Sequence, residues 1–259
     1  MKPKLAIQFG IAALIGAMLP AGPSAAAVVP LEPAKDTTIF SESVLESNGA
    51  GGALYVGRTG TLPGGGVRRA LLAFDVGASV LPGSVVTNVS LTLHLGNVPS
   101  QSVASPTVSL HRVLKNWGEA GSVSQGGKGG AAQPGDATWG SAFFTTDQWS
   151  VPGGDFVASA SASHLMADGA TIQVWTSTPK LVEDVQSWVD GASDYGWILI
   201  SDEQTNFSVR QFSSGDSAAD VLRPVLTIEY TQAVPEPATV AMLLAGLALL
   251  LGLNRKRFV

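Results

Sequence analysis

The sequence predicts an all-β protein: an antiparallel β-sandwich of jelly-roll type with one short helix, flanked by a signal peptide and a C-terminal single-span sorting helix. Three observations support this fold class. Eight or more short β-prone runs are separated by turn residues, only one run has helical spacing, and both ends of the chain carry apolar segments. A fold built from βαβ units would need helices alternating with the strands, which this pattern does not support.

The N-terminal segment is expected to be a signal peptide over residues 1–27. Lys2 and Lys4 precede an apolar run over residues 5–19, and the three alanines at 25–27 are small enough to suit cleavage by a signal peptidase. The sequence therefore predicts export across the inner membrane, with the exported chain beginning at residue 28.

The exported part is expected to comprise an extended leader over residues 28–35, with two prolines, and one domain over residues 36–232. It contains no cysteine, which excludes disulfides, thiolate metal sites and cysteine nucleophiles. Without the two leader lysines and the net +2 of the tail, the formal charge of −5 becomes −9. A diffuse negative charge argues against nucleic acid as a partner and makes a polyanionic glycan a poor fit.

The predicted strands are short runs with period-two alternation. In the clearest one, residues 89–95, apolar residues at odd positions share one face, so that Ser90, Thr92 and His94 should point outward. The glycine-rich segment 47–52 is expected to be a loop between two of these strands. The predicted strands are 37–40, 54–56, 68–76, 89–95, 107–114, 171–175, 197–201, 207–212 and 225–230.

One segment favours a helix. Thr178 suits the N-cap position, Pro179 suits the first helical position, and apolar residues recur at helical spacing between 181 and 188. Gly191 is expected to end this helix, because glycine readily adopts the left-handed conformation found after helix C-termini.

The region from 118 to 154 lacks regular periodicity but retains aromatic residues, which argue against simple disorder. Trp117, Trp139 and Trp149 are candidate glycan-binding residues, because a flat indole offers an apolar face and one donor that can stack on sugar rings. The alternative is that these tryptophans plug an open end of the sandwich. Trp149 lies outside every predicted strand and is expected to be the most exposed of the three.

Asp136 and Asp155 are candidate calcium ligands, because glycine-rich loops of jelly-roll modules often hold this ion with carboxylates and backbone carbonyls. The alternative is that each carboxylate accepts a local hydrogen bond from a backbone N–H of its own turn. No other cofactor is expected.

Catalytic signatures are weak in this chain. His94, His111 and His164 lack zinc-ligand spacing, no Gly-x-Ser-x-Gly elbow occurs in the exported part, and the glycines around Lys128 are not followed by the Ser or Thr of a phosphate loop. Sequence spacing does not test for the paired carboxylates of a glycosidase, because their separation depends on the fold. We therefore expect a protein that is not an enzyme.

The tail over residues 233–259 has three parts in order. Its sixteen charge-free residues would form a helix about 24 Å long, slightly short of a hydrocarbon core of about 30 Å. The basic end should stay in the cytoplasm, which places the preceding domain on the far side of the membrane. The three parts are the motif Val234, Pro235, Glu236 and Pro237, the apolar run 238–253, and the basic end Arg255, Lys256 and Arg257.

This order of motif, short apolar helix and basic end resembles the PEP-CTERM sorting tail of Gram-negative bacteria. The resemblance implies that an exosortase in the inner membrane recognises and removes the tail, and that the protein reaches the cell surface or an exopolysaccharide matrix. The alternative is a plain single-span anchor.

The exported domain is similar to the DNRLRE-domain family, jelly-roll modules related to carbohydrate-binding modules. The glycine-rich stretches 135–139 and 152–156 are similar to a bacterial subgroup of that family. The resemblance implies a non-catalytic surface module. Some relatives bind glycans and most have no known function, and extracellular polysaccharide is the partner expected here. The alternatives are a structural or adhesive matrix protein without a small ligand and, third, a glycan-active enzyme. Four stretches carry the resemblance: 69–75, 117–119 with 138–139, 195–201, and 210–212 with 223–226.

Overall fold

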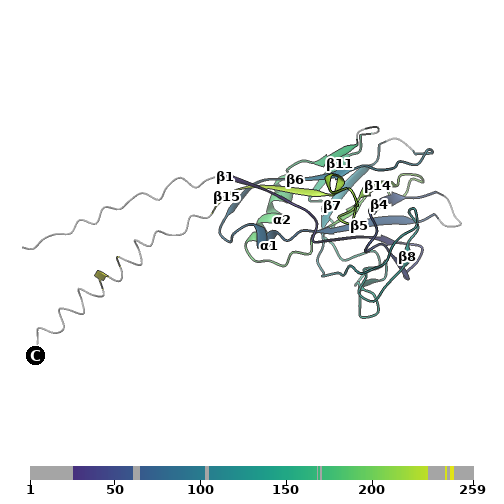
Figure 1. The fold of residues 1–259 in the computed structure, drawn as a ribbon, viewed down its shortest axis with the longest axis horizontal. Helices are drawn as coiled ribbons and strands as arrows, with labels where there is room; N and C mark the ends of the chain where they lie inside the picture. Colours follow the sequence, from purple (N-terminus) through teal and green to yellow (C-terminus); the bar gives the residue numbers. More distant parts are fainter. Residues whose placement is uncertain are drawn as a thin grey trace, which may run out of the picture. The chain divides into compact units, whose positions relative to one another are not determined.

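The computed structural model describes residues 26–60, 65–102, 105–167, 169 and 171–232, together with Leu243, Gly246 and Leu247. Residues 26–232 belong to one compact unit, in which every strand pairing described is antiparallel (Figure 1). This confirms the predicted mostly-β class with few helices. The sorting motif 234–237, the basic end 255–257 and nearly all of the predicted signal peptide lie outside the described residues.

Sheet A has four strands, and its central strand β6 is the run with the clearest predicted alternation. Val89, Leu91 and Leu93 are fully buried, while the residues between them face outward. A β-bulge at Thr87 shifts the register, so that Val86 also turns inward against Tyr230. The strand order is β1 (Ala26–Leu31), β15 (Val225–Thr231), β6 (Val85–His94) and β12 (Ile172–Trp175).

Strand β1 brings the predicted leader into the sheet. It pairs with β15 from Ala26 opposite Thr231 to Leu31 opposite Leu226. Residues 28–31 were expected to precede the domain, but they form an edge strand of sheet A. The sequence shows no period-two alternation here because residues 26–31 are all apolar, although their burial alternates along the strand. The proline at position 30 is tolerated because β1 is an edge strand, where a missing N–H can face solvent.

Sheet B has seven strands and curls toward sheet A. A bridge between Leu95 and Phe212 joins the end of β6 to β14, so the two sheets meet at one corner and form a curled half-barrel (Figure 1). The strand order is β11 (Ala162–Leu165), β7 (Thr107–Arg112), β13 (Trp197–Ile200), β5 (Val67–Ala73), β4 (Ala53–Arg58) and β14 (Arg210–Ser213), with β2 (Lys35–Phe40) also paired to β5. Two short pairs are β3 (Glu46–Ser47) with β8 (Gly130–Ala131) and β9 (Ser141–Phe143) with β10 (Asp147–Gln148).

The predicted helix is confirmed as α2 (Pro179–Val189). The Thr178 side chain accepts a hydrogen bond from the Leu181 N–H, and Gly191 has a φ of 94° just after the helix. Two further helical turns are α1 (Val76–Ser79) and the 3₁₀ turn η1 (Asp220–Leu222).

Several predicted strands are shorter than expected, and two of them end or begin early for a clear local reason. The strand expected over 68–76 ends at Ala73, because Asp75 caps α1 through a hydrogen bond from the Ala78 N–H. The strand expected over 207–212 begins at Arg210, because Phe207 has a φ of 64° and belongs to a turn.

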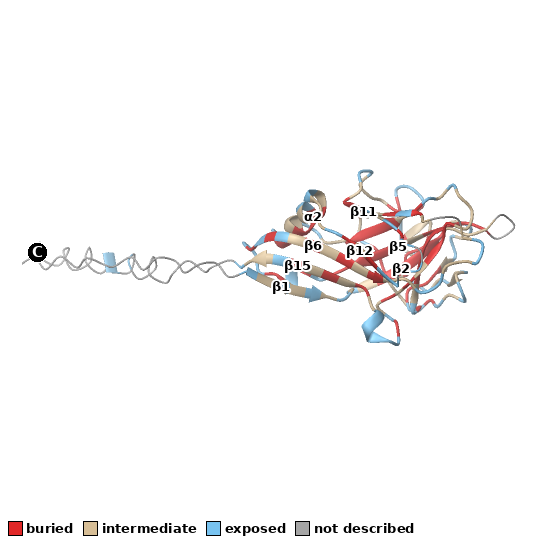
Figure 2. Cartoon of the chain, turned by 90° about the horizontal axis from the view of Figure 1, so that it is seen from above, coloured by how far each residue is buried: buried red, intermediate tan, exposed pale blue. Residues whose placement is uncertain are grey.

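The interior has two hydrophobic clusters, one on each face of sheet B. Core 1 fills the space between the two sheets and includes the apolar face of α2. Core 2 lies on the opposite face of sheet B, beneath the loop region 113–157. Strand β13 contributes Trp197 and Leu199 to core 1 and Ile198 to core 2, so it is buried on both faces. Its neighbour β5 is likewise mostly buried (Figure 2). Core 2 comprises Ile39, Leu71, Ala73, Val113, Trp117, Ala137, Ala142, Trp149 and Ile198.

Candidate functional site

The tryptophans of the irregular region are structural in this fold. Trp117 is 1% exposed, its Nε1 donates to the Tyr195 carbonyl at 2.9 Å, and the Lys35 ammonium lies 4.2 Å from its ring centroid. Trp149 is 5% exposed, and its Nε1 donates to the Thr138 carbonyl at 2.9 Å. The expectation that Trp149 is exposed was wrong, because the loop region folds back over sheet B and places this ring in core 2.

Trp139 is half-buried, and an arginine covers its ring. The Arg69 guanidinium lies 4.8 Å from the Trp139 centroid and 5.4 Å from the Phe156 centroid. The same guanidinium is fixed by Glu203, with contacts of 2.6 and 2.9 Å to the two carboxylate oxygens, and by the Gly153 carbonyl at 2.8 Å. The ring face that a sugar would need is therefore used by a cation–π contact within the protein.

Asp136 and Asp155, the predicted calcium ligands, bind backbone N–H groups. The carboxylate of Asp136 is fully buried and accepts from the Ala120 and Gln133 N–H groups, each at 2.7 Å. The Asp155 carboxylate accepts from two consecutive N–H groups, at positions 150 and 151. Both residues thus have the local backbone role that the sequence left open as the alternative. Within the described residues, no group of three or more His, Cys, Asp or Glu side chains is placed to hold a metal ion.

The three histidines occupy separate places. His94 is half-buried on the outward face of β6, as predicted. His164 contacts the Gln173 side chain at 2.8 Å and lies against the Trp175 ring. His111 lies on the outer face of β7, with Nδ1 2.9 Å from the Val157 carbonyl.

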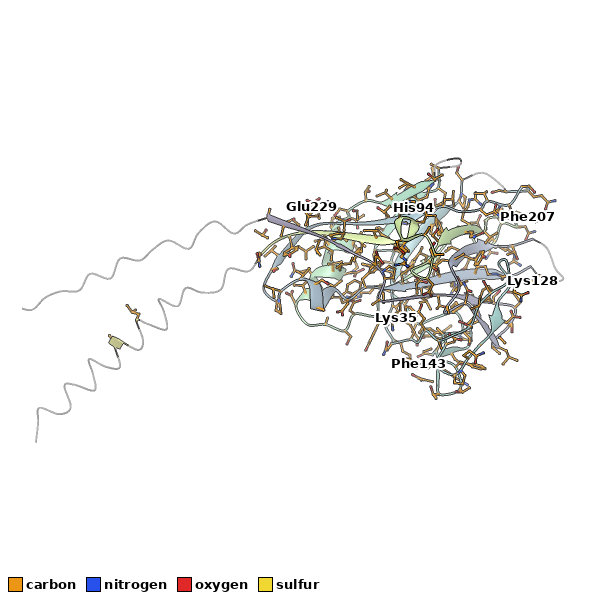
Figure 3. The ribbon with its side chains drawn as sticks, in the orientation of Figure 1. Lys35, His94, Lys128, Phe143, Phe207 and Glu229 are labelled. Carbon is orange, nitrogen blue, oxygen red and sulfur yellow. The ribbon has the colours of Figure 1, made fainter. Side chains whose placement is uncertain are left out.

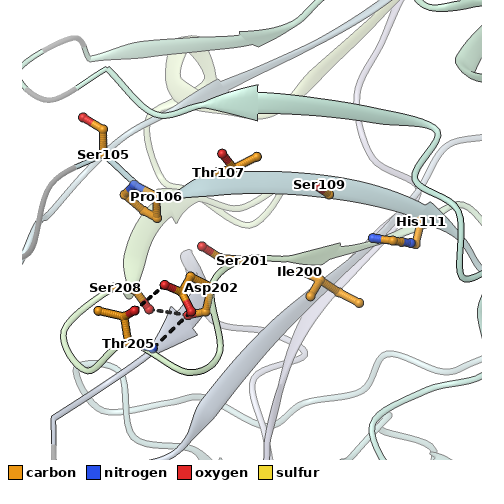
Figure 4. A pocket seen from close by; sticks show the side chains of 10 residues that line it. All are labelled: Ser105, Pro106, Thr107, Ser109, His111, Ile200, Ser201, Asp202, Thr205 and Ser208. Atoms are coloured by element: carbon orange, nitrogen blue, oxygen red, sulfur yellow. Dashed lines mark hydrogen bonds between the residues drawn. The ribbon is translucent and has the colours of Figure 1, made fainter.

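An open groove of about 580 Å³ lies on the outer face of sheet B beside His111 (Figure 4). The alternation of β7 turns Val108 and Leu110 into core 1, which leaves the residues between them on the outside. The end of β13 and the following turn form the opposite wall. The groove is lined by Ser105, Pro106, Thr107, Ser109, His111, Ile200, Ser201, Asp202, Thr205 and Ser208.

The turn 202–208 is held by hydrogen bonds to Asp202. Its Oδ1 accepts from the Gln204 and Thr205 N–H groups at 2.9 and 3.1 Å, and its Oδ2 accepts from the Thr205 hydroxyl. The Ser208 hydroxyl donates to the Asp202 carbonyl at 2.5 Å (Figure 4). The Thr205 hydroxyl and then the two N–H groups lower the pKa of the exposed Asp202 carboxyl, so the groove carries a negative charge at neutral pH.

The polar groups of the groove are arranged for hydrogen bonding. Because a carbonyl only accepts, His111 Nδ1 must donate to Val157, which leaves Nε2 of the neutral ring as an acceptor. Asp202 uses both oxygens within its own turn, and no contact described joins it to His111 or to Ser201. The period-two alternation of residues 107–112 indicates which of them face outward. It does not indicate that the turn 202–208 forms the opposite wall of the groove, because that depends on the fold.

Comparison with known proteins adds information about the tail only. Residues 233–257 match the PEP-CTERM protein-sorting motif, in agreement with the resemblance drawn from the sequence. No curated protein matches the chain. In the part of the chain that the structure describes, no helix is long and apolar enough to cross a membrane, and only Leu243, Gly246 and Leu247 of the predicted span 238–253 belong to that part. The motif identifies the chain as an exported, exosortase-sorted surface protein.

Proposed function

We propose that the exported domain is a non-catalytic carbohydrate-binding module, and that its ligand is a neutral extracellular polysaccharide. The observation that carries this proposal is the groove between β7 and the turn 202–208. It is open along the sheet and presents several hydroxyls and one imidazole, which match the alternating donors and acceptors of a sugar chain. Pro106 and Ile200 add apolar surface for the C–H faces of the sugar.

The charge of the domain favours a neutral glycan over an acidic one. The exported part carries a formal charge of −9, and the ionised Asp202 carboxylate stands at the groove itself. Both would repel a polyanion. Nucleic acid is disfavoured as a partner for the same reason.

Further proposals concern topology and sorting. We propose that the curled pair of sheets is a jelly roll of the DNRLRE type, because all its strand pairings are antiparallel and the four similar stretches span the domain. We also propose that an exosortase in the inner membrane of a Gram-negative bacterium holds the tail transiently before the protein reaches the surface or matrix. The sorting motif over residues 233–257 supports the exosortase step.

A structural or adhesive matrix protein without a small ligand is the second candidate. It is favoured by the burial of Trp117 and Trp149, which leaves the groove without the aromatic platform that many sugar sites use. An enzyme is the third candidate. The contacts of His111 and Asp202 argue against it, since neither side chain orients the other as a general acid or base would require.

Blocking the groove tests the carbohydrate proposal. Thr107 is exposed on the outward face of β7, so Thr107→Trp would place an indole in the groove without disturbing core 1. We expect at least tenfold weaker retention of the full-length chain in affinity gels that contain neutral polysaccharides, with a nearly unchanged thermal midpoint. The control is Thr87→Trp, because Thr87 is also exposed but lies on β6 of sheet A.

Two outcomes would contradict the carbohydrate proposal. If the wild-type chain is retained by no neutral polysaccharide, the structural or adhesive role becomes the better account. If Thr107→Trp and Thr87→Trp bind as well as the wild type, binding occurs at a surface other than the groove.

A further inference from the structure

A buried carboxylate at the start of β2 lacks a partner for one of its oxygens. Asp36 is 1% exposed, and its Oδ2 accepts from the Gly215 N–H at 2.5 Å. Its Oδ1 is buried and has no hydrogen-bond partner among the described residues. An unsatisfied buried oxygen of this kind destabilises the folded state, and more strongly when it is charged. Some group other than the described protein atoms is therefore needed beside it.

Two other carboxylates approach Asp36 from distant parts of the chain. Glu119, in the loop that follows Trp117, accepts from the Asp36 N–H at 3.0 Å through Oε1. Asp216 follows Gly215 directly, and its negative charge acts on both Asp36 and Glu119. The fold thus gathers negative charge at one place from segments that are 83 and 179 residues from Asp36.

This concentration of charge is poorly compensated by the protein itself. Burial, followed by the neighbouring carboxylates, raises the pKa of Asp36 to about 8, and burial raises that of Glu119 to about 7. Lys35, labelled in Figure 3, is a cation near Glu119. Its ammonium is already bound to the Asn116 side chain and the Trp117 carbonyl and lies over the Trp117 ring. It therefore does not satisfy Asp36 Oδ1.

A proton alone does not satisfy the geometry either. A protonated Oδ1 would become a donor that still needs an acceptor, and no hydrogen bond joins Oδ1 to any described residue. A hard divalent cation needs no acceptor. It binds carboxylate oxygens at about 2.3–2.6 Å and completes its shell with backbone carbonyls and water.

We propose that Asp36 and Glu119 form the anionic half of a Ca²⁺ site that joins the start of β2 to the loop after Trp117, with Asp216 at its outer edge. The site differs from the calcium candidates Asp136 and Asp155, whose oxygens bind backbone N–H groups. Two carboxylates do not fill a calcium shell, so main-chain carbonyls and water supply the remaining ligands. Among the described residues no group of three or more His, Cys, Asp or Glu side chains is placed to hold a metal ion, so Asp216 contributes its charge and is not a ligand.

The test is a calcium titration of the full-length chain in detergent after treatment with a chelator. With CaCl₂ alone at pH 8, we expect saturable one-site binding by calorimetry and a higher thermal midpoint, because an ion that binds only the folded state stabilises it. Asp36→Asn and Glu119→Gln retain the side-chain shapes but remove one charge each. Each should weaken binding at least tenfold.

The control variant is Asp155→Asn, which should bind Ca²⁺ like the wild type because Asp155 lies in a different turn. Glu119→Gln gives an independent answer if Asp36→Asn does not fold. The proposal is overturned if CaCl₂ produces neither binding heat nor a change of midpoint in the wild type. It is equally overturned if the folded variants at Asp36 and Glu119 keep wild-type affinity.

Discussion

Individual side chains hold the loop region 113–157 against sheet B. Trp149 combines a ring in core 2 with a hydrogen bond from Nε1 to the Thr138 carbonyl. Trp139 is less buried and stacks on Arg69. The two tryptophans lie ten residues apart in the same irregular region, and only their tertiary contacts separate their roles.

Trp149→Ala should destabilise the domain by about 3–5 kcal/mol, because removing a buried tryptophan leaves a cavity and an unpaired carbonyl. Urea unfolding should show a clearly lower midpoint, and glycan binding by the folded fraction should stay unchanged. Trp139→Ala is the comparison and should cost less, since its ring is only partly buried. A normal midpoint in Trp149→Ala combined with lost glycan binding would instead support an exposed sugar platform.

At the scale of elements, α2 depends on two kinds of contact. Thr178 caps its N-terminus through the Leu181 N–H and also donates to the Ser161 carbonyl. Asp184, fully buried within the helix, accepts from the Ser161 hydroxyl and from the Trp197 indole, and its other oxygen lies 3.6 Å from Arg112 Nε. Thr178 orders the first turn of the helix and bonds to Ser161, whereas Asp184 joins the helix to Ser161, Trp197 and Arg112 through one buried carboxylate.

Thr178→Ala should therefore cost about 1 kcal/mol, the usual effect of losing an N-cap. Asp184→Ala should cost about 3–5 kcal/mol, because it leaves the Trp197 N–H and the Ser161 hydroxyl without their buried acceptor and removes the ion pair with Arg112. Denaturant unfolding of both variants measures the difference. Equal losses would mean that the buried carboxylate does not attach the helix to the sheet.

These elements also show what the sequence can predict. The helix and the strand over 89–95 were predictable, because period and caps are local signals. The role of Asp184 was not, since an acid near a helix N-terminus looks the same in the sequence whether it faces solvent or a buried indole. The groove likewise required β7 and the turn 202–208 to be brought together, and Trp149 lies where no periodicity exists to indicate its face.

At the scale of the whole molecule, buried carboxyls make the fold sensitive to pH. Burial is the first cause that raises the pKa of Asp36 to about 8, of Glu119 to about 7 and of Asp194 to about 6. In the unfolded chain, carboxyl groups titrate near pH 4. Between about pH 4 and 8 the folded state thus binds more protons than the unfolded state.

The free energy of unfolding should therefore fall as the pH rises through this window, because stability decreases with pH wherever the folded state holds the additional protons. Urea unfolding in the presence of a chelator, at intervals from pH 5 to pH 9, measures the slope. Asp36→Asn keeps the side chain neutral at every pH, so its profile should be flatter than that of the wild type. Asp202→Asn should retain the wild-type slope in this range, because the pKa of the exposed Asp202 is lowered and not raised. A wild-type stability that is constant or that increases from pH 5 to pH 8 would show that these carboxyls are ionised in the folded state, and that burial does not govern their titration.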